Sequence, residues 1–142
     1  MVYCFYDNLA AAVAPEIQLP NRRMGQALGR ETILECIITA YPQAVNYWQK
    51  DGRRVVSSAK YRVDAYDEED NTVVLSLRIH DIELSDYGEY TCVAANALGR
   101  DQETMYLYGM TSLSCNNFLC QFIFDNLLRK TYCLLTQNVR QS

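Results

Sequence analysis

The 142-residue sequence is poor in histidine, proline and glycine: it has one histidine, three prolines and six glycines. A single histidine, His80, excludes a histidine-rich metal site, although the count alone leaves a Ser-His-Asp site open. The net charge of −4 argues against nucleic-acid binding, which requires a basic surface facing the phosphates. No Asn-x-Ser/Thr acceptor occurs, so we expect no N-glycosylation.

Long hydrophobic runs are also missing. Residues 1–14 are mildly apolar but carry Asp7 and no basic segment, which is a poor match to a signal peptide. The apolar stretch Phe118–Leu128 is interrupted by polar residues and is too short to span a bilayer. We therefore expect neither a clear export signal nor a clear membrane anchor in the sequence as written.

Motifs for catalysis and cofactor binding are not found. There is no phosphate-binding glycine loop, no Ser or Cys with a base at motif spacing, and no Cys-x-x-Cys pair of a zinc site. The acidic run from Asp67 to Asn71 lacks the ligand order of a calcium-binding EF-hand loop, so we expect a solvated loop. We expect His80 to be a surface residue, and we expect no enzyme activity, no cofactor and no metal.

What the sequence does have is tyrosine (11 residues) and hydrophobic alternation. Between residues 15 and 109, short alternating runs are broken by turn signals, a spacing typical of an all-β sandwich. This predicts an irregular segment over 1–14, one β domain over 15–109, and a poorly ordered or short-helical tail over 110–142. The expected strands are Ile17–Leu19, a short run between Gly25 and Gly29, Thr32–Thr39, Ala44–Lys50, Val55–Val56, Tyr61–Ala65, Val73–Ile79, Tyr87–Ala95 and Gln102–Tyr108.

Four residues in the middle zone are more specific than the general alternation. Cys36 is followed by Trp48 twelve residues later and by Cys92 after 56 residues, and Tyr90 lies two residues before Cys92. This spacing, with the tyrosine before the second cysteine, is typical of an immunoglobulin domain. The segment from Cys92 to Gly99 also matches the C-x-A-x-N-x-x-G ending of intermediate-set (I-set) domains. We therefore expect an immunoglobulin-like Greek-key sandwich of two antiparallel sheets.

Within that class, the resemblance is narrower. The segments LECIITAYPQAVNYWQKDG, KYRV and GEYTCVAANALG resemble the third, membrane-proximal domain of lachesin and of the Dpr-interacting proteins of insect neurons, which are related to vertebrate IgLON proteins. The resemblance covers residues 15–109 and implies a disulfide between Cys36 and Cys92, with Trp48, Leu75 and Tyr90 in the core. Two free buried cysteines, as in intracellular muscle-type domains, are the alternative pairing state.

The run from Asp86 to Cys92 adds an ion pair. In such domains an acidic residue at this turn usually pairs with a cation at the start of an earlier strand, and Lys60 is our candidate, with Arg62 as the second choice. We expect this pair to fix the loop and not to take part in catalysis. Because it is partly exposed, its expected contribution is about 0–1 kcal/mol.

Strand alternation also predicts an exposed apolar patch on one sheet. It places Val45, Tyr47, Val93 and Ala95 outward, with Tyr106 beside them and Val55 or Val56 at the edge. Exposed apolar and aromatic side chains on a sheet face are typical of binding surfaces. The alternative is scattered exposure, or a face covered by the flanking segments or a neighbouring domain.

The two flanks carry the other four cysteines, Cys4, Cys115, Cys120 and Cys133, whose pairing the sequence leaves open. In the tail, one set of apolar residues fits one face of a short amphipathic helix: Phe118, Phe122, Ile123, Leu127 and Leu128. Neither flank matches the family, which is consistent with a truncated product or with a genuine variant.

The resemblance implies a non-enzymatic recognition module of a neuronal cell-adhesion protein. Its partners would be other immunoglobulin-superfamily surface proteins, homophilic or heterophilic, and its place would be the extracellular face of the plasma membrane or the secreted fraction. Nucleic acid and small-molecule substrates are not expected. The alternatives are an intracellular structural domain of the muscle type, and a fragment without independent function.

Overall fold

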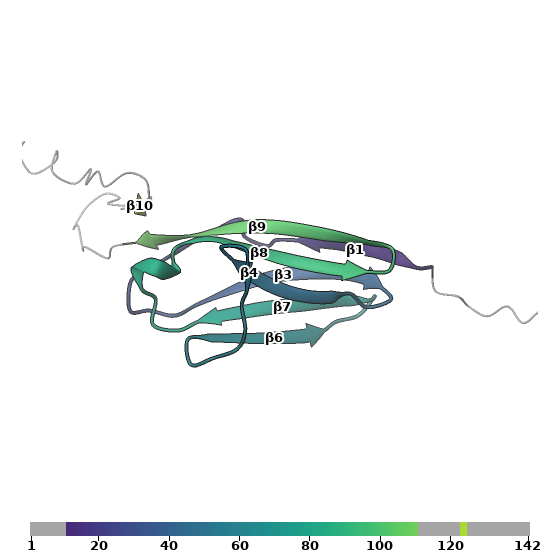
Figure 1. Cartoon of the computed structure of the whole chain (residues 1–142), viewed down its shortest axis with the longest axis horizontal. Coiled ribbons are helices and arrows are strands. Elements are labelled where there is room, and N and C mark those ends of the chain that lie inside the picture. Colours follow the sequence, from purple (N-terminus) through teal and green to yellow (C-terminus); the bar gives the residue numbers. More distant parts are fainter. Residues whose placement is uncertain (1–10, 111–122, 125–142) are drawn as a thin grey trace, which may run out of the picture.

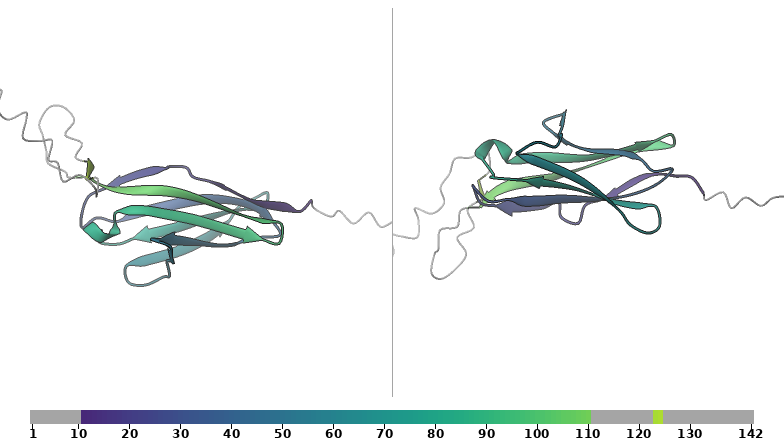
Figure 2. Two further views of the ribbon diagram at one scale, coloured as in Figure 1. Left: turned by 45° about the horizontal axis from the view of Figure 1, so that its top comes forward. Right: turned by 90° about the horizontal axis from the view of Figure 1, so that it is seen from below.

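The structure is a computed structural model that describes residues 11–110 and 123–124. Two β-sheets pack face to face (Figures 1 and 2). The sheet that we call the back sheet has the strand order β1-β3-β7-β6, and the front sheet has the order β10-β9-β8-β4-β5, with β2 also paired to β9. The strands are β1 (Val13–Gln18), β2 (Arg23–Gln26), β3 (Thr32–Tyr41), β4 (Val45–Lys50), β5 (Arg53–Arg54), β6 (Tyr61–Asp67), β7 (Thr72–Ile79), β8 (Gly88–Asn96), β9 (Gly99–Met110) and β10 (Ile123–Phe124), and a 3-10 turn, η1 (Leu84–Asp86), precedes β8. The all-β immunoglobulin-like fold that the sequence predicts is confirmed.

Alternation along the strands selects the side chains of the core. Leu34, Cys36 and Ile38 are buried along β3, while Ile33 and Glu35, on the opposite face of the strand, are exposed. Alternate residues of β7, Leu75, Leu77 and Ile79, join the same core. A period of two places these side chains on one face of each strand. The two inner faces together form one apolar layer between the sheets.

A tight two-residue turn sets the strand register of the β4–β5 hairpin. Asp51 and Gly52 both have positive φ angles, 51° and 72°, which suits the turn that joins β4 to β5. Asp70 and Asn71, with φ angles of 58° and 59°, lie in the longer loop that joins β6 to β7. Asn, Asp and Gly adopt this backbone region at low cost. The Asp51–Gly52 turn thereby aligns Gln49 with Arg54 across the first hairpin.

The N-terminal segment contributes to both sheets. β1 pairs antiparallel with β3 in the back sheet, and after Pro20 the chain crosses over so that β2 runs parallel to β9 in the front sheet. This parallel pair differs from the two purely antiparallel sheets that we expected. β2 lies so close to β9 in this pair that a Cβ atom at Gly25 would collide with the side chains of Tyr108 and Met110.

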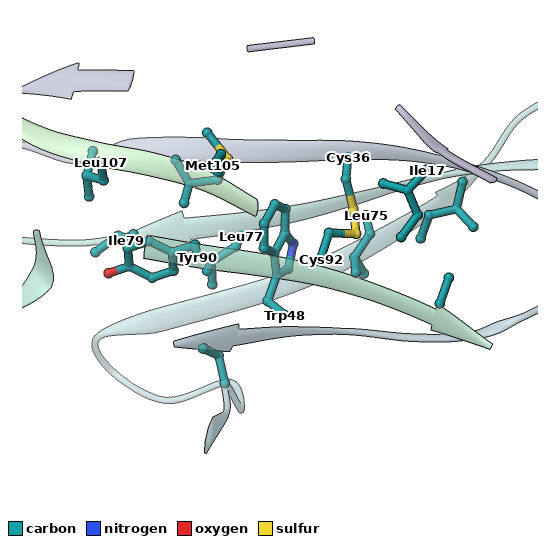
Figure 3. Packing of buried hydrophobic residues seen from close by; sticks show 14 of the residues in the cluster. Ile17, Cys36, Trp48, Leu75, Leu77, Ile79, Tyr90, Cys92, Met105 and Leu107 are labelled. Carbon is teal, nitrogen blue, oxygen red and sulfur yellow. A yellow bond between two sulfur atoms is a disulfide. The ribbon is translucent and has the colours of Figure 1, made fainter. Parts of the chain in front are cut away.

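A disulfide joins the two sheets through their centres. Cys36 in β3 and Cys92 in β8 form the bond, with their Cα atoms 6.5 Å apart. Trp48 in β4 is fully buried and is the cross-strand neighbour of Cys92. Leu75 in β7 is the cross-strand neighbour of Cys36. Figure 3 shows the indole ring beside the two sulfur atoms. The bridge and the ring together hold the front and back sheets at a fixed separation.

Several local predictions differ from the structure. The second short strand is Arg23–Gln26 and not the expected run between Gly25 and Gly29. The fifth strand is Arg53–Arg54; Val55 follows it into the core, and Val56 is exposed. The first strand begins at Val13, inside the segment that we expected to be irregular. Ile123 and Phe124 form a strand against Met110 and Gly109, where we expected a helix. The other residues of that expected helix, and the four flanking cysteines, lie outside the described residues.

The central bridge gives a stability prediction. Because it closes a loop with a sequence separation of 56, its removal should lower the free energy of unfolding by about 4 kcal/mol on the chain-entropy estimate. Chemical denaturation of the Cys36→Ala/Cys92→Ala variant measures this loss, and reduction of the wild-type protein should give a loss of similar size. An unchanged denaturation midpoint in both experiments would contradict the prediction.

Candidate functional site: the outer face of the front sheet

A buried carboxylate fixes the turn that leads into β8. Asp86 is 3% exposed, whereas we expected a partly exposed pair, and its Oδ2 lies 2.6 Å from Lys60 Nζ. The backbone N–H of Glu83 donates to the same oxygen at 2.7 Å, and the hydroxyl of Tyr61 donates to Oδ1 at 3.0 Å. Arg62, the second candidate for this pair, lies 2.8 Å from Asp64 instead.

The hydrogen bonds around Asp86 determine its ionisation. Burial by itself would raise the pKa of this carboxyl group, but the hydrogen bonds from Lys60, the Glu83 N–H and the Tyr61 hydroxyl outweigh burial and lower the pKa. Burial and the hydrogen bond to Asp86 raise the pKa of Tyr61 to about 12. The carboxylate is therefore charged and the phenol neutral at physiological pH.

The same turn is tied to the core through Tyr90. Its hydroxyl donates to the backbone oxygen of Asp86 at 2.6 Å, the tyrosine-corner contact of immunoglobulin folds. Lys50 Nζ lies 5.0 Å from the centroid of the Tyr90 ring and donates to the backbone oxygen of Ser85. Burial lowers the pKa of Lys50. These contacts connect Lys60, Asp86 and Tyr90 at the turn that leads into β8.

The outer face of the front sheet carries the predicted apolar patch. Val45 and Ala95 are direct cross-strand neighbours in β4 and β8, and Tyr47 and Val93 form the next-but-one pair of the same ladder. Val45 is 66% exposed, and Tyr47 and Ala95 are partly exposed. Alternation thus brings these residues together on one face, at the end of the sheet where β4 begins.

Val93 differs from the expectation of an exposed side chain, since it is only 1% exposed. It does not belong to the core cluster between the sheets, so it lies on the outer face as its position in the strand requires. Its direct neighbours there are Tyr47 in β4 and Gln102 in β9, whose longer side chains stand on either side of it. Val93 therefore offers a partner almost no surface.

Tyr106 belongs to a different part of the face. It pairs with Glu89, four residues along β8 from Val93, which corresponds to about 13 Å at the rise of a β-strand. Tyr106 and Tyr108 both have the guanidinium of Arg23 at 5.7 Å from their ring centroids. The structure thus divides the predicted patch into a group around Tyr47 and a separate tyrosine pair at the other end.

The arginine on Tyr47 was missed by the sequence analysis. The Cζ atom of Arg54 lies 5.0 Å from the centroid of the Tyr47 ring, which is a cation–π contact. The Asp51–Gly52 turn contained the signal: it aligns Arg54 with Gln49, and Tyr47 is the diagonal neighbour on the same face. The patch therefore has a positive charge beside its aromatic residue.

Other residues considered in the sequence play no part in this patch. His80 is partly exposed, and its Nδ1 lies 3.3 Å from Glu31 Oε2. Among residues 11–110 and 123–124, no group of three His, Cys, Asp or Glu side chains is placed to hold a metal ion. In the same part of the chain, no helix has the length and hydrophobicity to cross a membrane.

Comparisons with known proteins identify the family. The family model described as the immunoglobulin I-set domain matches residues 15–108. The chain belongs to the immunoglobulin I-set family. Lachesin of Drosophila melanogaster is 33% identical over 101 residues, which are 71% of this chain and 28% of that protein. Lachesin of Schistocerca americana is 35% identical over 103 residues, which are 71% of this chain and 29% of that protein.

Two solved structures of different kinds contain a domain similar to this one. A chain in the complex of Dpr2 Ig1-Ig2 with DIP-Theta Ig1-Ig3 matches with a TM-score of 0.67 and 31% identity, over 70% of this chain and 33% of that chain. The titin tandem domains A164-A165 match with a TM-score of 0.60 and 26% identity, over 71% of this chain and 49% of that chain. The resemblance to lachesin and Dpr-type adhesion proteins is thus confirmed, and the chain spans less than a third of the length of the two lachesins.

The Asp86 group gives a prediction on acid stability. A carboxyl group whose pKa is lowered by folding stabilises the protein fully above its unfolded pKa of about 3.9, and this contribution is lost as the pH falls through the lower folded value. The variant Asp86→Asn should lose about 3 kcal/mol at neutral pH, because Lys60 is left without its carboxylate. It should also show a smaller stability loss below about pH 4.

Denaturant unfolding between pH 7 and pH 2 measures both effects. Asp70→Asn is the control, because it removes an exposed carboxylate at a turn position that asparagine tolerates. The control should keep the acid-induced loss of the wild type. Equal stability and equal pH dependence of Asp86→Asn and Asp70→Asn would show that the buried group does not stabilise the fold.

Proposed function

We propose that this domain is a non-enzymatic recognition module of a neuronal cell-adhesion protein, acting in cell–cell recognition and in synaptic or axonal specificity. Its partners are other immunoglobulin-superfamily surface proteins, and its place is the extracellular face of the plasma membrane or the secreted fraction. Support comes from the similarity to the two lachesins and to a chain of the Dpr2–DIP-Theta complex, in which two proteins with tandem Ig domains are bound to each other.

The observation that carries the proposal is the group around Tyr47. Its aromatic ring has Arg54 over one face, the highly exposed Val45 lies two residues away on the same side of β4, and Ala95 flanks them in β8. Aromatic residues and arginine are the residue types that dominate the energetics of protein interfaces. A flat face presented by a disulfide-linked sheet loses little conformational entropy on binding.

A second function is favoured by one comparison. A titin homolog of Caenorhabditis elegans is 35% identical over 89 residues, which are 63% of this chain. An intracellular structural domain of the muscle type would keep the fold and the core, but it would not need an oxidised bridge or an exposed binding face. The redox state of Cys36 and Cys92 therefore separates the two functions.

Substitution of Tyr47 tests the binding face. Tyr47→Glu should weaken association with an immunoglobulin-superfamily partner about thirtyfold, the loss of a typical interface hot spot, because it places a charge in an apolar contact. The measurement is surface plasmon resonance of the full chain against itself and against a panel of purified cell-surface ectodomains. Ile33→Glu, an equivalent change on the outer face of the back sheet, should leave affinity unchanged. Equal affinities of Tyr47→Glu and the wild type would exclude this face.

The compartment is tested by the cysteines. In the protein isolated from its native tissue with thiols blocked at lysis, non-reducing peptide mass spectrometry should find Cys36 and Cys92 in one linked peptide pair. Free thiols at both positions would favour the intracellular structural domain.

A further inference from the structure

The back sheet ends at β6, beyond which no described element lies (Figure 1). The hydrogen bonds at the two ends of the strand show which backbone groups face outward. The N–H of His80 donates to the backbone oxygen of Lys60, and the N–H of Glu68 donates to that of Thr72. Since hydrogen-bonded and non-bonded pairs alternate in an antiparallel ladder, even-numbered residues of β6 bond to β7 and odd-numbered residues point their N–H and C=O groups away.

The first half of this outer edge is already covered. Two serines of the segment before β6 occupy it: Ser58 Oγ accepts the N–H of Tyr61 at 3.2 Å, and Ser57 Oγ accepts the N–H of Val63 at 3.1 Å. In the second half, the outward groups of Ala65 and Asp67 have no partner among the described residues. An edge with free N–H and C=O groups is a template for an added strand.

The surroundings of the free half determine the chemistry of a ligand. Asp67, Glu68, Glu69 and Asp70 follow one another at the end of β6 and are all exposed. Beside them is a cavity of about 290 Å³. Its lining includes the apolar side chains of Ala40, Tyr41 and Val73, and also Gln43, Asp67 and Glu68. Apolar walls next to carboxylates suit a lysine or arginine, whose aliphatic stem packs against the walls while its charged end meets the acids.

We propose that the free half of the β6 edge binds an extended, lysine- or arginine-rich segment of a partner protein as an added β-strand. The free backbone groups of Ala65 and Asp67 supply the hydrogen bonds, and one basic side chain enters the cavity. A second copy of this edge is a poor occupant, because it would bring two acidic clusters together. The site lies on the back sheet and is separate from the group around Tyr47.

A lysine–valine alternating heptapeptide serves as the probe. It is titrated into the ¹⁵N-labelled full chain, in which the four cysteines outside the Cys36–Cys92 bridge are replaced by serine. We expect amide shifts centred on Ala65 and Asp67 and slower hydrogen exchange of these two N–H groups. A glutamate–valine peptide of equal length should give no shifts. No binding of the lysine peptide, or shifts confined to the front sheet, would overturn the proposal.

The backbone contribution is tested from both sides. Ala65→Pro removes an N–H group that the domain itself does not use, so the fold should persist while peptide affinity falls about fivefold or more. If that variant does not fold, a peptide methylated at alternate backbone nitrogens tests the reciprocal bonds, from the peptide N–H groups to the carbonyl oxygens of the edge, on the unaltered protein. Glu68→Gln should lower the affinity for the peptide and make that affinity less dependent on salt concentration. Glu89→Gln in β8 should change neither quantity. Unchanged affinity for both the Ala65→Pro variant and the methylated peptide would show that no strand is added.

Discussion

The contact of Trp48 with the Cys36–Cys92 bridge is the interaction on which the rest of the structure depends. It joins the two sheets at their centres, and the apolar residues of β3, β7 and β8 fill the space around it. A loop with this sequence separation strongly restricts the unfolded chain when it is closed. Because the disulfide and the core residues hold the two sheets together, the side chains on the outer faces are not required for the packing between the sheets.

Much of the fold was predictable because a period of two is easy to recognise. The buried positions of β3 and β7 follow it directly, and the Cys–Trp–Cys spacing with Tyr90 specified which strands face each other. The start of β2 was harder to read, because its parallel pairing with β9 depends on a crossing from one sheet to the other that no local pattern records. β2 has only four residues and its burial does not alternate, so its sequence gives little indication of a strand.

The candidate surface was predicted less completely, for reasons that lie in the neighbouring strands. Alternation placed Val93 on the outer face, but its burial depends on Tyr47 and Gln102, which approach only after the strands pair. Tyr106 lies on the same face as Tyr47 but at the other end of the sheet. Alternation gives the face of a side chain, whereas its place along the neighbouring strand depends on the register. Arg54 became visible only through the turn that aligns it with Gln49. Register is thus the information that single-strand patterns lack.

The two sheets expose different chemistry, with arginine and tyrosine on the front and carboxylates at the β6 edge of the back sheet. This separation requires that the central packing be intact. Trp48 is the one tryptophan of the chain, so its fluorescence reports on that packing directly. We expect blue-shifted emission that iodide does not quench in the oxidised native protein, with a shift to the emission of an indole in water only on unfolding. Native emission at the wavelength of a solvated indole, fully quenched by iodide, would contradict it.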